Sequence, residues 1–312
     1  MDRLLWTGLS LVVILFATPS FSEEDVAQHL QDVSVTIKAG SSEGSGVLIT
    51  RELLLTNEVQ EKVKVNFVVT CAHVVANLKS TRTTIENGKP KAVVEFRDAQ
   101  IVKELVEKGR KVGELKMDAK VILFSDADNG EDLALLMVRK LNFVDTNTEF
   151  ELGSEPSKIG TQLFHVGSLL GQSGANSMTT GIMSQVGRVL NIGSGDGVVF
   201  DQTTVTAFPG SSGGGVFLTN GKYVGMLVRG AGETFNLTVP VRRMKAWAKE
   251  RKVEWVLDPT KPVPSLVNIQ KIDPESNPSS DLKPEPDPNI KKYPYLIKIS
   301  SLIEPQLKPK GE

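Results

Sequence analysis

The sequence predicts an all-β barrel protein whose globular part ends in one helix. Short stretches rich in valine, isoleucine, phenylalanine and threonine alternate with turns that contain glycine, asparagine, aspartate or serine. Hydrophobic residues make up 40% of the 312 residues, which suffices for a core of this kind. This length corresponds to about two average domains, but β-barrel proteins of roughly 200 to 250 residues commonly form one. We therefore expect a single domain over residues 23–257.

Each expected strand is a short apolar stretch bounded by turn residues. The expected strands are 33–38, 45–50, 64–70, 91–96, 120–124, 133–138, 162–167, 178–189, 198–203, 215–218, 223–228 and 235–239. Residues 242–251 follow with Met244, Trp247 and Ala248 at helical spacing, which predicts the closing helix.

The segment 99–109 lies outside this strand pattern. Ile101, Val102, Leu105 and Val106 recur at helical spacing and Gly109 follows, so we expect a short amphipathic helix. Its apolar face would pack on the core or dock a partner, and the spacing does not decide between the two.

The run AFPGSSGGG at residues 207–215 predicts a nucleophile beside an oxyanion-binding turn. Glycines allow a tight turn in which backbone N–H groups converge on one point, and they leave room for a carbonyl group beside Ser212. Glycine and serine clusters are also common in ordinary loops, so Ser212 needs a base as partner.

Histidine is the usual base, and the chain has three. His29 lies just after the N-terminal apolar segment, and His165 lies in an apolar stretch typical of a structural histidine. His73 follows the β-branched run VNFVVTCA, where a buried strand breaks into a turn. A carboxylate must then orient the imidazole, and Asp132 is the acid that directly precedes an apolar strand, LALLMV.

These residues lie in motifs that resemble the three catalytic blocks of trypsin-like serine proteases. The motifs are TCAHVV at 70–75, DLALL at 132–136 and GSSGG at 210–214. The segments 44–50, 221–230 and 235–241 resemble further strands of bacterial HtrA-type enzymes, and the likeness covers roughly residues 30–250. Ser211 and Gly215 depart from the family pattern without removing a catalytic group. No PDZ-like domain is recognised after the strands, so we expect no regulation through one.

The resemblance implies two packed six-stranded β-barrels and a serine endopeptidase mechanism. His73, Asp132 and Ser212 would form the triad, and the N–H groups of Gly210 and Ser212 would bind the oxyanion. An extended substrate would pair with residues 227–230. Neither a metal nor an organic cofactor is expected.

The resemblance also assigns a specificity pocket without an acidic residue, so we expect small or medium aliphatic side chains at the cleavage position. Its expected walls are Thr206, Val228, Arg229, Gly230 and Phe235, with Leu237 nearby. Two alternatives stay open: a catalytically silent peptide-binding or scaffold module, and an esterase. The second is less favoured, because no GxSxG elbow lies between a strand and a helix.

The N-terminus predicts export. Arg3, the apolar stretch LSLVVILFA and small residues at Ser20 and Ser22 are typical of a signal peptide over residues 1–22, with an uncleaved anchor as the alternative. Cys71 is the only cysteine, which excludes an intrachain disulfide and favours a bacterial periplasmic or secreted protein over disulfide-stapled animal relatives.

Charge and the C-terminal composition complete the prediction. The net charge of −1 does not favour nucleic acid or anionic membranes, so we expect polypeptide substrates, no nucleic acid and no stable membrane insertion after signal cleavage. The oligomeric state is not predicted.

Residues 258–312 are rich in proline and charge, which is typical of a flexible tail. Within it, the apolar patch 293–304 would form a strand or a docking segment.

Overall fold

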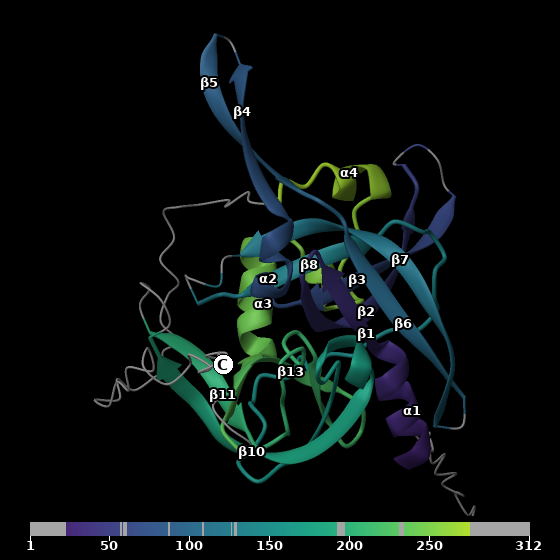
Figure 1. Cartoon of the computed structure of the whole chain (residues 1–312), viewed down its shortest axis with the longest axis vertical. Helices are drawn as coiled ribbons and strands as arrows, with labels where there is room; N and C mark the ends of the chain where they lie inside the picture. Colours follow the sequence, from purple (N-terminus) through teal and green to yellow (C-terminus); the bar gives the residue numbers. More distant parts are fainter. Residues whose placement is uncertain are drawn as a thin grey trace, which may run out of the picture.

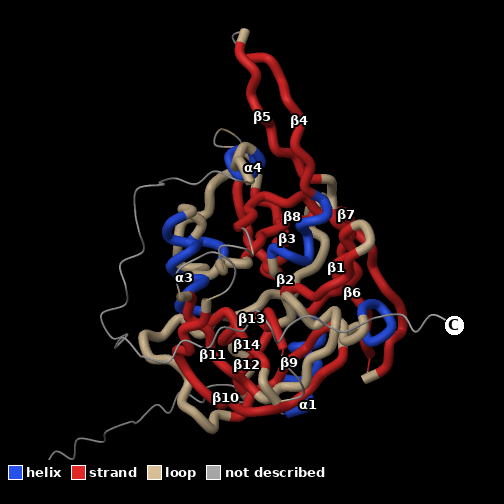
Figure 2. Tube along the Cα trace, turned by 60° about the vertical axis from the view of Figure 1, so that its left-hand side comes forward, coloured by secondary structure: helices blue, strands red, loops and turns tan. Residues whose placement is uncertain are grey.

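The computed structural model describes residues 23–274, except 57, 59, 60, 87, 108, 126, 128, 129, 192–196 and 231–233. In this part of the chain the strands form two closed barrels and one separate two-stranded sheet (Figures 1 and 2). The expected signal peptide and the apolar patch 293–304 lie outside the described residues.

The first barrel holds the N-terminal strands. Around its circumference run β1 (Ser34–Ala39), β2 (Ser42–Leu54), β3 (Lys62–Thr70), β8 (Leu133–Val138), β7 (Arg110–Ser125) and β6 (Ala99–Glu107). Every residue of β8 is buried, because its apolar run LALLMV pairs with β3 and β7 in the middle of the molecule. This burial places the residue just before β8, Asp132, inside the fold.

The second barrel agrees closely with the expected strands. It runs β10 (Ser177–Leu190), β11 (Val198–Thr203), β14 (Asn236–Pro240), β13 (Tyr223–Gly230), β12 (Gly215–Leu218) and β9 (Gln162–Gly167). Tyr223 and Phe217, both fully buried, pack edge to face with ring centroids 5.4 Å apart. The all-β prediction with two six-stranded barrels is confirmed.

The predicted helix at 99–109 is wrong, because Ala99–Glu107 forms β6. It pairs with β1 on one side and β7 on the other, so it closes the first barrel. The helix α1 (Glu23–Val33) packs against it, and Ile101, Val102 and Lys103 are buried in succession. Because residues on both faces are buried at 101–103, this part of the strand lacks the alternation that marks a half-buried strand, and the spacing of its apolar residues imitates a helix.

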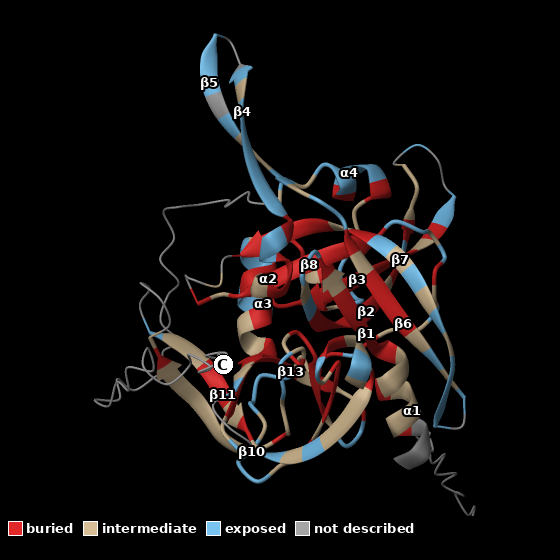
Figure 3. Ribbon diagram, in the orientation of Figure 1, coloured by how far each residue is buried: buried red, intermediate tan, exposed pale blue. Residues whose placement is uncertain are grey.

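The expected strand 91–96 exists, but outside the barrel. It forms β5 (Lys89–Phe96) and pairs with β4 (Lys79–Glu86) in a hairpin that projects from the molecule (Figures 1 and 3). Ile85 on this hairpin is 80% exposed.

The closing helix forms as α3 (Val241–Glu250) and buries Val241, Met244, Trp247 and Ala248. The short 3₁₀ turn η3 (Glu254–Val256) follows, and the buried Arg51 of β2 donates to the carbonyls of Trp255 and Val256 at 2.8 and 2.6 Å. These bonds attach the C-terminal segment to the first barrel. Among the described helices, none has the length and apolar character needed to cross a bilayer.

Packed structure continues beyond residue 257, where we expected the tail to start. The helix α4 (Leu266–Gln270) buries Leu266 and Ile269, and the N–H of Phe124 donates to the carbonyl of Pro274 at 2.9 Å. Residues up to 274 therefore belong to the packed domain.

Candidate active site

His73 lies in a single turn of helix, α2 (Ala72–Val75), that begins where β3 leaves the barrel. Its Nδ1 lies 2.8 Å from Oδ2 of Asp132, and its backbone N–H donates to Oδ1 of the same carboxylate at 3.0 Å. The imidazole is 37% exposed. One edge of the ring is therefore held by a carboxylate while the side chain still reaches solvent, as a general base requires.

Asp132 is held in an unusual backbone conformation. Its φ is +52°, in the left-handed region that is uncommon for residues other than glycine but in which asparagine and aspartate are enriched, and its side chain is 2% exposed. Burial alone would raise the pKa of this carboxyl group, but the hydrogen bonds and charge of His73 outweigh burial and lower it. Asp132 is therefore ionised at neutral pH and fixes the position of the imidazole.

Ser212 lies in a turn that only glycines permit. Gly213 has φ +89°, and a Cβ there would overlap the carbonyl of Ser45 and the hydroxyl of Thr70. The hydroxyl of Ser212 donates to the carbonyl of Val228 at 3.4 Å. Within the described residues no hydrogen bond joins Ser212 to His73.

The turn before Ser212 presents two free backbone donors. The carbonyl of Pro209 accepts a hydrogen bond from the N–H of Leu170 at 2.8 Å, and a trans peptide directs the N–H of Gly210 to the opposite side. Among the described residues neither the N–H of Gly210 nor that of Ser212 has an acceptor. These are the two groups expected to bind an oxyanion.

The strand β13 has an open edge next to this turn. Its pairing with β12 extends from Tyr223 to Met226, and Leu227 bonds to Gly213 and Gly214. Arg229 and Gly230 pair with β14, and among the described residues no strand pairs with 228–230 on the opposite side. The expected substrate edge is thus free to accept an extended chain at these positions.

The expected pocket residues occupy different surroundings. Thr206, at one end, receives a hydrogen bond on its carbonyl from Thr179 at 3.1 Å. The ring of Phe235 lies 5.5 Å from the guanidinium of Arg188. Arg229 lies close enough to the triad for its charge to help lower the pKa of Asp132, after the larger effects of burial and His73.

Asn236 lies against Gly230, one of the expected pocket residues, and the sequence did not single it out. It is fully buried, donates to the carbonyl of Val205 at 2.6 Å, and lies so close to Gly230 that a Cβ there would overlap its Oδ1. Strand alternation places Asn236 inward, a signal that the larger neighbours Phe235 and Leu237 obscured.

His165 has the surroundings of a structural histidine. It is fully buried, its Nδ1 lies 2.9 Å from the carbonyl of Gly215, and burial lowers its pKa to about 4, although the hydrogen bond to Gly215 opposes this. The pKa of His29 is also lowered by burial, against the raising effect of Asp32 and Glu149. Within the part of the chain that the structure describes, neither histidine forms a hydrogen bond with Ser212 or Asp132.

Cys71, His73 and Asp132 form one group of metal-ligating side chains, with ligand atoms within 4.8 Å of one another. Two of those atoms, Nδ1 of His73 and Oδ2 of Asp132, already bond to each other. Burial raises the pKa of the Cys71 thiol well above its usual value, and the charge of Asp132 adds to this, so the thiolate that metals prefer is disfavoured. The arrangement fits a hydrogen-bonded acid–base pair better than a metal site.

A family model described as a trypsin-like peptidase domain matches residues 44–226, more than half of the chain. The chain belongs to this family. The matched segment contains His73, Asp132 and Ser212. A comparison with curated protein sequences gives no significant match.

Solved structures of bacterial proteases share the fold. The inactive form of a serine-to-alanine mutant of Rv3671c from M. tuberculosis H37Rv is 17% identical, with a TM-score of 0.51 and coverage of 81% of this chain and 100% of that one. The serine endoprotease from Yersinia pestis is 16% identical, with a TM-score of 0.51 and coverage of 76% and 68%. The HtrA-type protease AlgW, with a tripeptide, is 19% identical, with a TM-score of 0.51 and coverage of 75% and 64%. At these identities the likeness concerns the fold alone.

Proposed function

We propose that this protein is a serine endopeptidase that uses His73, Asp132 and Ser212. The observation that carries the proposal is the pairing of His73 with a buried, ionised Asp132, together with two backbone N–H donors at Gly210 and Ser212 that have no acceptor among the described residues. Folding alone does not require this combination, since the buried His165 has a backbone carbonyl as the partner of its Nδ1.

The proposed reaction begins when the Ser212 hydroxyl turns from the Val228 carbonyl toward His73. His73 takes the hydroxyl proton while the Ser212 oxygen bonds to the scissile carbonyl carbon, and the N–H groups of Gly210 and Ser212 receive the negative charge on the carbonyl oxygen. The carbon–nitrogen bond then breaks, and the leaving amine takes the proton from His73. Water, activated by the same imidazole, hydrolyses the acyl ester and restores Ser212.

The proposed substrate is an extended polypeptide. Its backbone would pair with the open edge at 228–230, which gives affinity with little dependence on sequence. None of the expected pocket residues is acidic, and the side chain of Asn236 lies against Gly230. Both observations favour a small or medium aliphatic side chain at the cleavage position. We propose exported or misfolded proteins in the periplasm or outside the cell as substrates, with a mature chain that begins near Glu23 or an uncleaved anchor.

A catalytically silent peptide-binding module is the second candidate. The observation that favours it is the hydroxyl of Ser212, which donates to the carbonyl of Val228 at 3.4 Å and, among the described residues, forms no hydrogen bond with His73. In that case the open edge of β13 would bind peptides without cleaving them.

Labelling with a fluorophosphonate separates the two candidates. A peptidase should form one adduct on Ser212, and Ser212→Ala should lose both the label and the cleavage of casein, while Ser154→Ala, which alters an exposed serine, should keep both. Binding of a peptide without labelling or cleavage would favour the silent module. An adduct on Ser211 would show that the nucleophile is misassigned.

A further inference from the structure

One fully buried hydroxyl joins the two barrels at the turn that carries Ser212. Ser45 of β2 is inaccessible to solvent, and its hydroxyl donates to the carbonyl of Gly210 at 2.7 Å. Its backbone N–H donates to the carbonyl of Ser212 at 2.8 Å. A residue of the first barrel thus binds the two peptide groups, 210–211 and 212–213, that flank the peptide carrying the N–H of Ser212.

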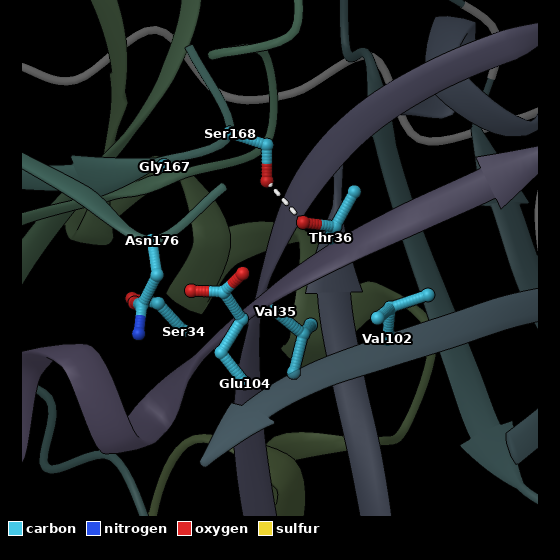
Figure 4. A pocket seen from close by; sticks show the side chains of 8 residues that line it. All are labelled: Ser34, Val35, Thr36, Val102, Glu104, Gly167, Ser168 and Asn176. Atoms are coloured by element: carbon cyan, nitrogen blue, oxygen red, sulfur yellow. Dashed lines mark hydrogen bonds between the residues drawn. The ribbon is translucent and has the colours of Figure 1, made fainter. Parts of the chain in front are cut away.

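Ser45 is itself held in place from two directions. Its carbonyl accepts a hydrogen bond from the hydroxyl of Thr70, and its own hydroxyl accepts one from the N–H of Ser168, both at 2.7 Å. The hydroxyl of Ser168 lies 2.6 Å from that of Thr36 on β1, at the side of a pocket that Glu104 and Asn176 also line (Figure 4). The side chain of Ser45 therefore has little freedom to move.

The segment that begins at Ser168 also packs on the oxyanion turn. A Cβ on Gly210 would overlap the carbonyl of Ser168 and the backbone of Gly171, and Leu170 donates to the carbonyl of Pro209. The Ser45 hydroxyl links this segment to Gly210, because it accepts a hydrogen bond from the N–H of Ser168 and donates one to the carbonyl of Gly210.

The chemistry of an oxyanion hole makes such a link consequential. Its donors stabilise the transition state only when they are aimed in advance at the developing charge, and small displacements weaken them. Loss of the Ser45 hydroxyl would leave the Gly210 carbonyl and the Ser168 N–H without that partner in a buried region. A turn of the 210–211 peptide would relieve this and move the neighbouring N–H groups.

We propose that Ser45 is a positioning residue that holds the N–H groups of Gly210 and Ser212 in the geometry that binds the oxyanion. The proposal rests on the proposed peptidase function. Ser45 touches no reacting atom and acts through the turn, so its effect belongs to kcat and not to substrate binding.

The test compares wild type, Ser45→Cys and Ser45→Ala on a peptide p-nitroanilide with valine at the cleavage position. Since removal of a whole oxyanion donor costs about 10²- to 10³-fold, we expect Ser45→Ala to lower kcat about tenfold to a hundredfold with KM nearly unchanged. Ser45→Cys, which is close in size and a weaker donor, should lie between. The rate of fluorophosphonate labelling should fall in the same order, and the pH of half-maximal kcat should not move, because the His73–Asp132 pair is untouched.

Ser125→Ala is the matched control. Ser125 is also buried, and its hydroxyl accepts from Trp247 at 2.6 Å and Arg251 at 3.2 Å, away from the turn. It should lower Tm as Ser45→Ala does but leave kcat unchanged. The positioning role would be overturned by equal kcat values in wild type, Ser45→Cys and Ser45→Ala. It would also be overturned if Ser125→Ala lowered kcat as much as Ser45→Ala does. If the wild-type protein is neither labelled nor able to cleave the peptide, the proposed function fails together with the positioning role. If the wild type is active and the variants match it, only the positioning role fails. If Ser45→Ala does not fold, Ser45→Cys still decides the question.

Discussion

His73 and His165 show how one residue type acquires two roles in the two barrels of this chain. Both use Nδ1 for a short hydrogen bond, at 2.8 and 2.9 Å. The partner of His73 is a carboxylate and its ring is 37% exposed, whereas the partner of His165 is a carbonyl and its ring is fully buried. A carboxylate compensates the positive charge that an imidazole gains when it takes up a proton. A backbone carbonyl in a buried site without water compensates this charge only weakly. The partner and the exposure, more than the histidine, therefore decide which imidazole is fit for catalysis.

The largest effect should come from His73→Ala. Removal of the base is expected to lower kcat by about 10⁵-fold or more, because Ser212 then lacks a proton acceptor. His165→Ala should leave kcat per folded molecule within about an order of magnitude and lower Tm instead, through the lost packing. Steady-state kinetics with thermal unfolding of both variants checks this, and a dead His165→Ala beside an active His73→Ala would reverse the assignment.

Asp132→Asn should follow with a loss of about 10⁴-fold in kcat. The amide keeps the shape of the side chain but donates where the carboxylate accepts, so the imidazole is held in the wrong tautomer. Glu131→Gln, a neighbouring acid-to-amide change, should have little effect on kcat. Activity of Asp132→Asn close to wild type would show that the bond to His73 is not used in the reaction.

The next effect concerns stability and pH. The pKa of His165 is lowered to about 4 from 6.5, so as the pH falls below 6.5 the unfolded chain takes up a proton that the folded chain refuses. Between pH 6.5 and pH 4 the folded state should lose about 3 kcal/mol from this group alone. Urea unfolding at pH 7 and pH 4.5 measures it.

His165→Gln should be less stable than wild type at pH 7 but should lose less stability on acidification. The lowered pKa of His29 contributes in the same direction, and His29→Gln measures its share. An equal pH dependence in His165→Gln and wild type would mean that His165 does not titrate as its burial indicates.

The smallest effect should come from removal of the chain beyond Pro274. Every group of the candidate site precedes it, so kcat/KM on a short peptide should match that of the full chain. Truncation after Leu257 is the contrasting case, because it removes the buried Leu266 and Ile269 and should lower Tm. A rise in kcat/KM after removal of residues 275–312 would instead indicate an inhibitory segment.

Local signals in the sequence were sufficient for the candidate triad. His73 follows a β-branched run, Asp132 precedes another, and Ser212 stands before three glycines, so each residue is marked by its immediate neighbours. A strand forms at each of the twelve expected ranges, since each is likewise marked by an apolar run between turn residues, although 91–96 lies outside the two barrels.

Two predictions, the helix at 99–109 and the place of the strand 91–96 in the barrel, were wrong because they depend on residues distant in sequence. The spacing at 99–107 resembles a helix where α1 packs on β6 and buries residues 101–103 in succession, and the barrel position expected for 91–96 is occupied by β6. Neither fact is visible in a short window of residues.

The sequence by itself therefore determined the fold class, the family resemblance and the three candidate catalytic residues, since turn and strand chemistry act over a few neighbouring positions. Only the tertiary structure decided that His73 and not His165 meets a carboxylate, that Asn236 lies against Gly230, and that Ser45 binds the turn around Ser212. Ser45 and Gly210 are joined across 165 positions. Hydrogen bonds are short and directional, so such a contact exists only after both barrels have closed and packed together.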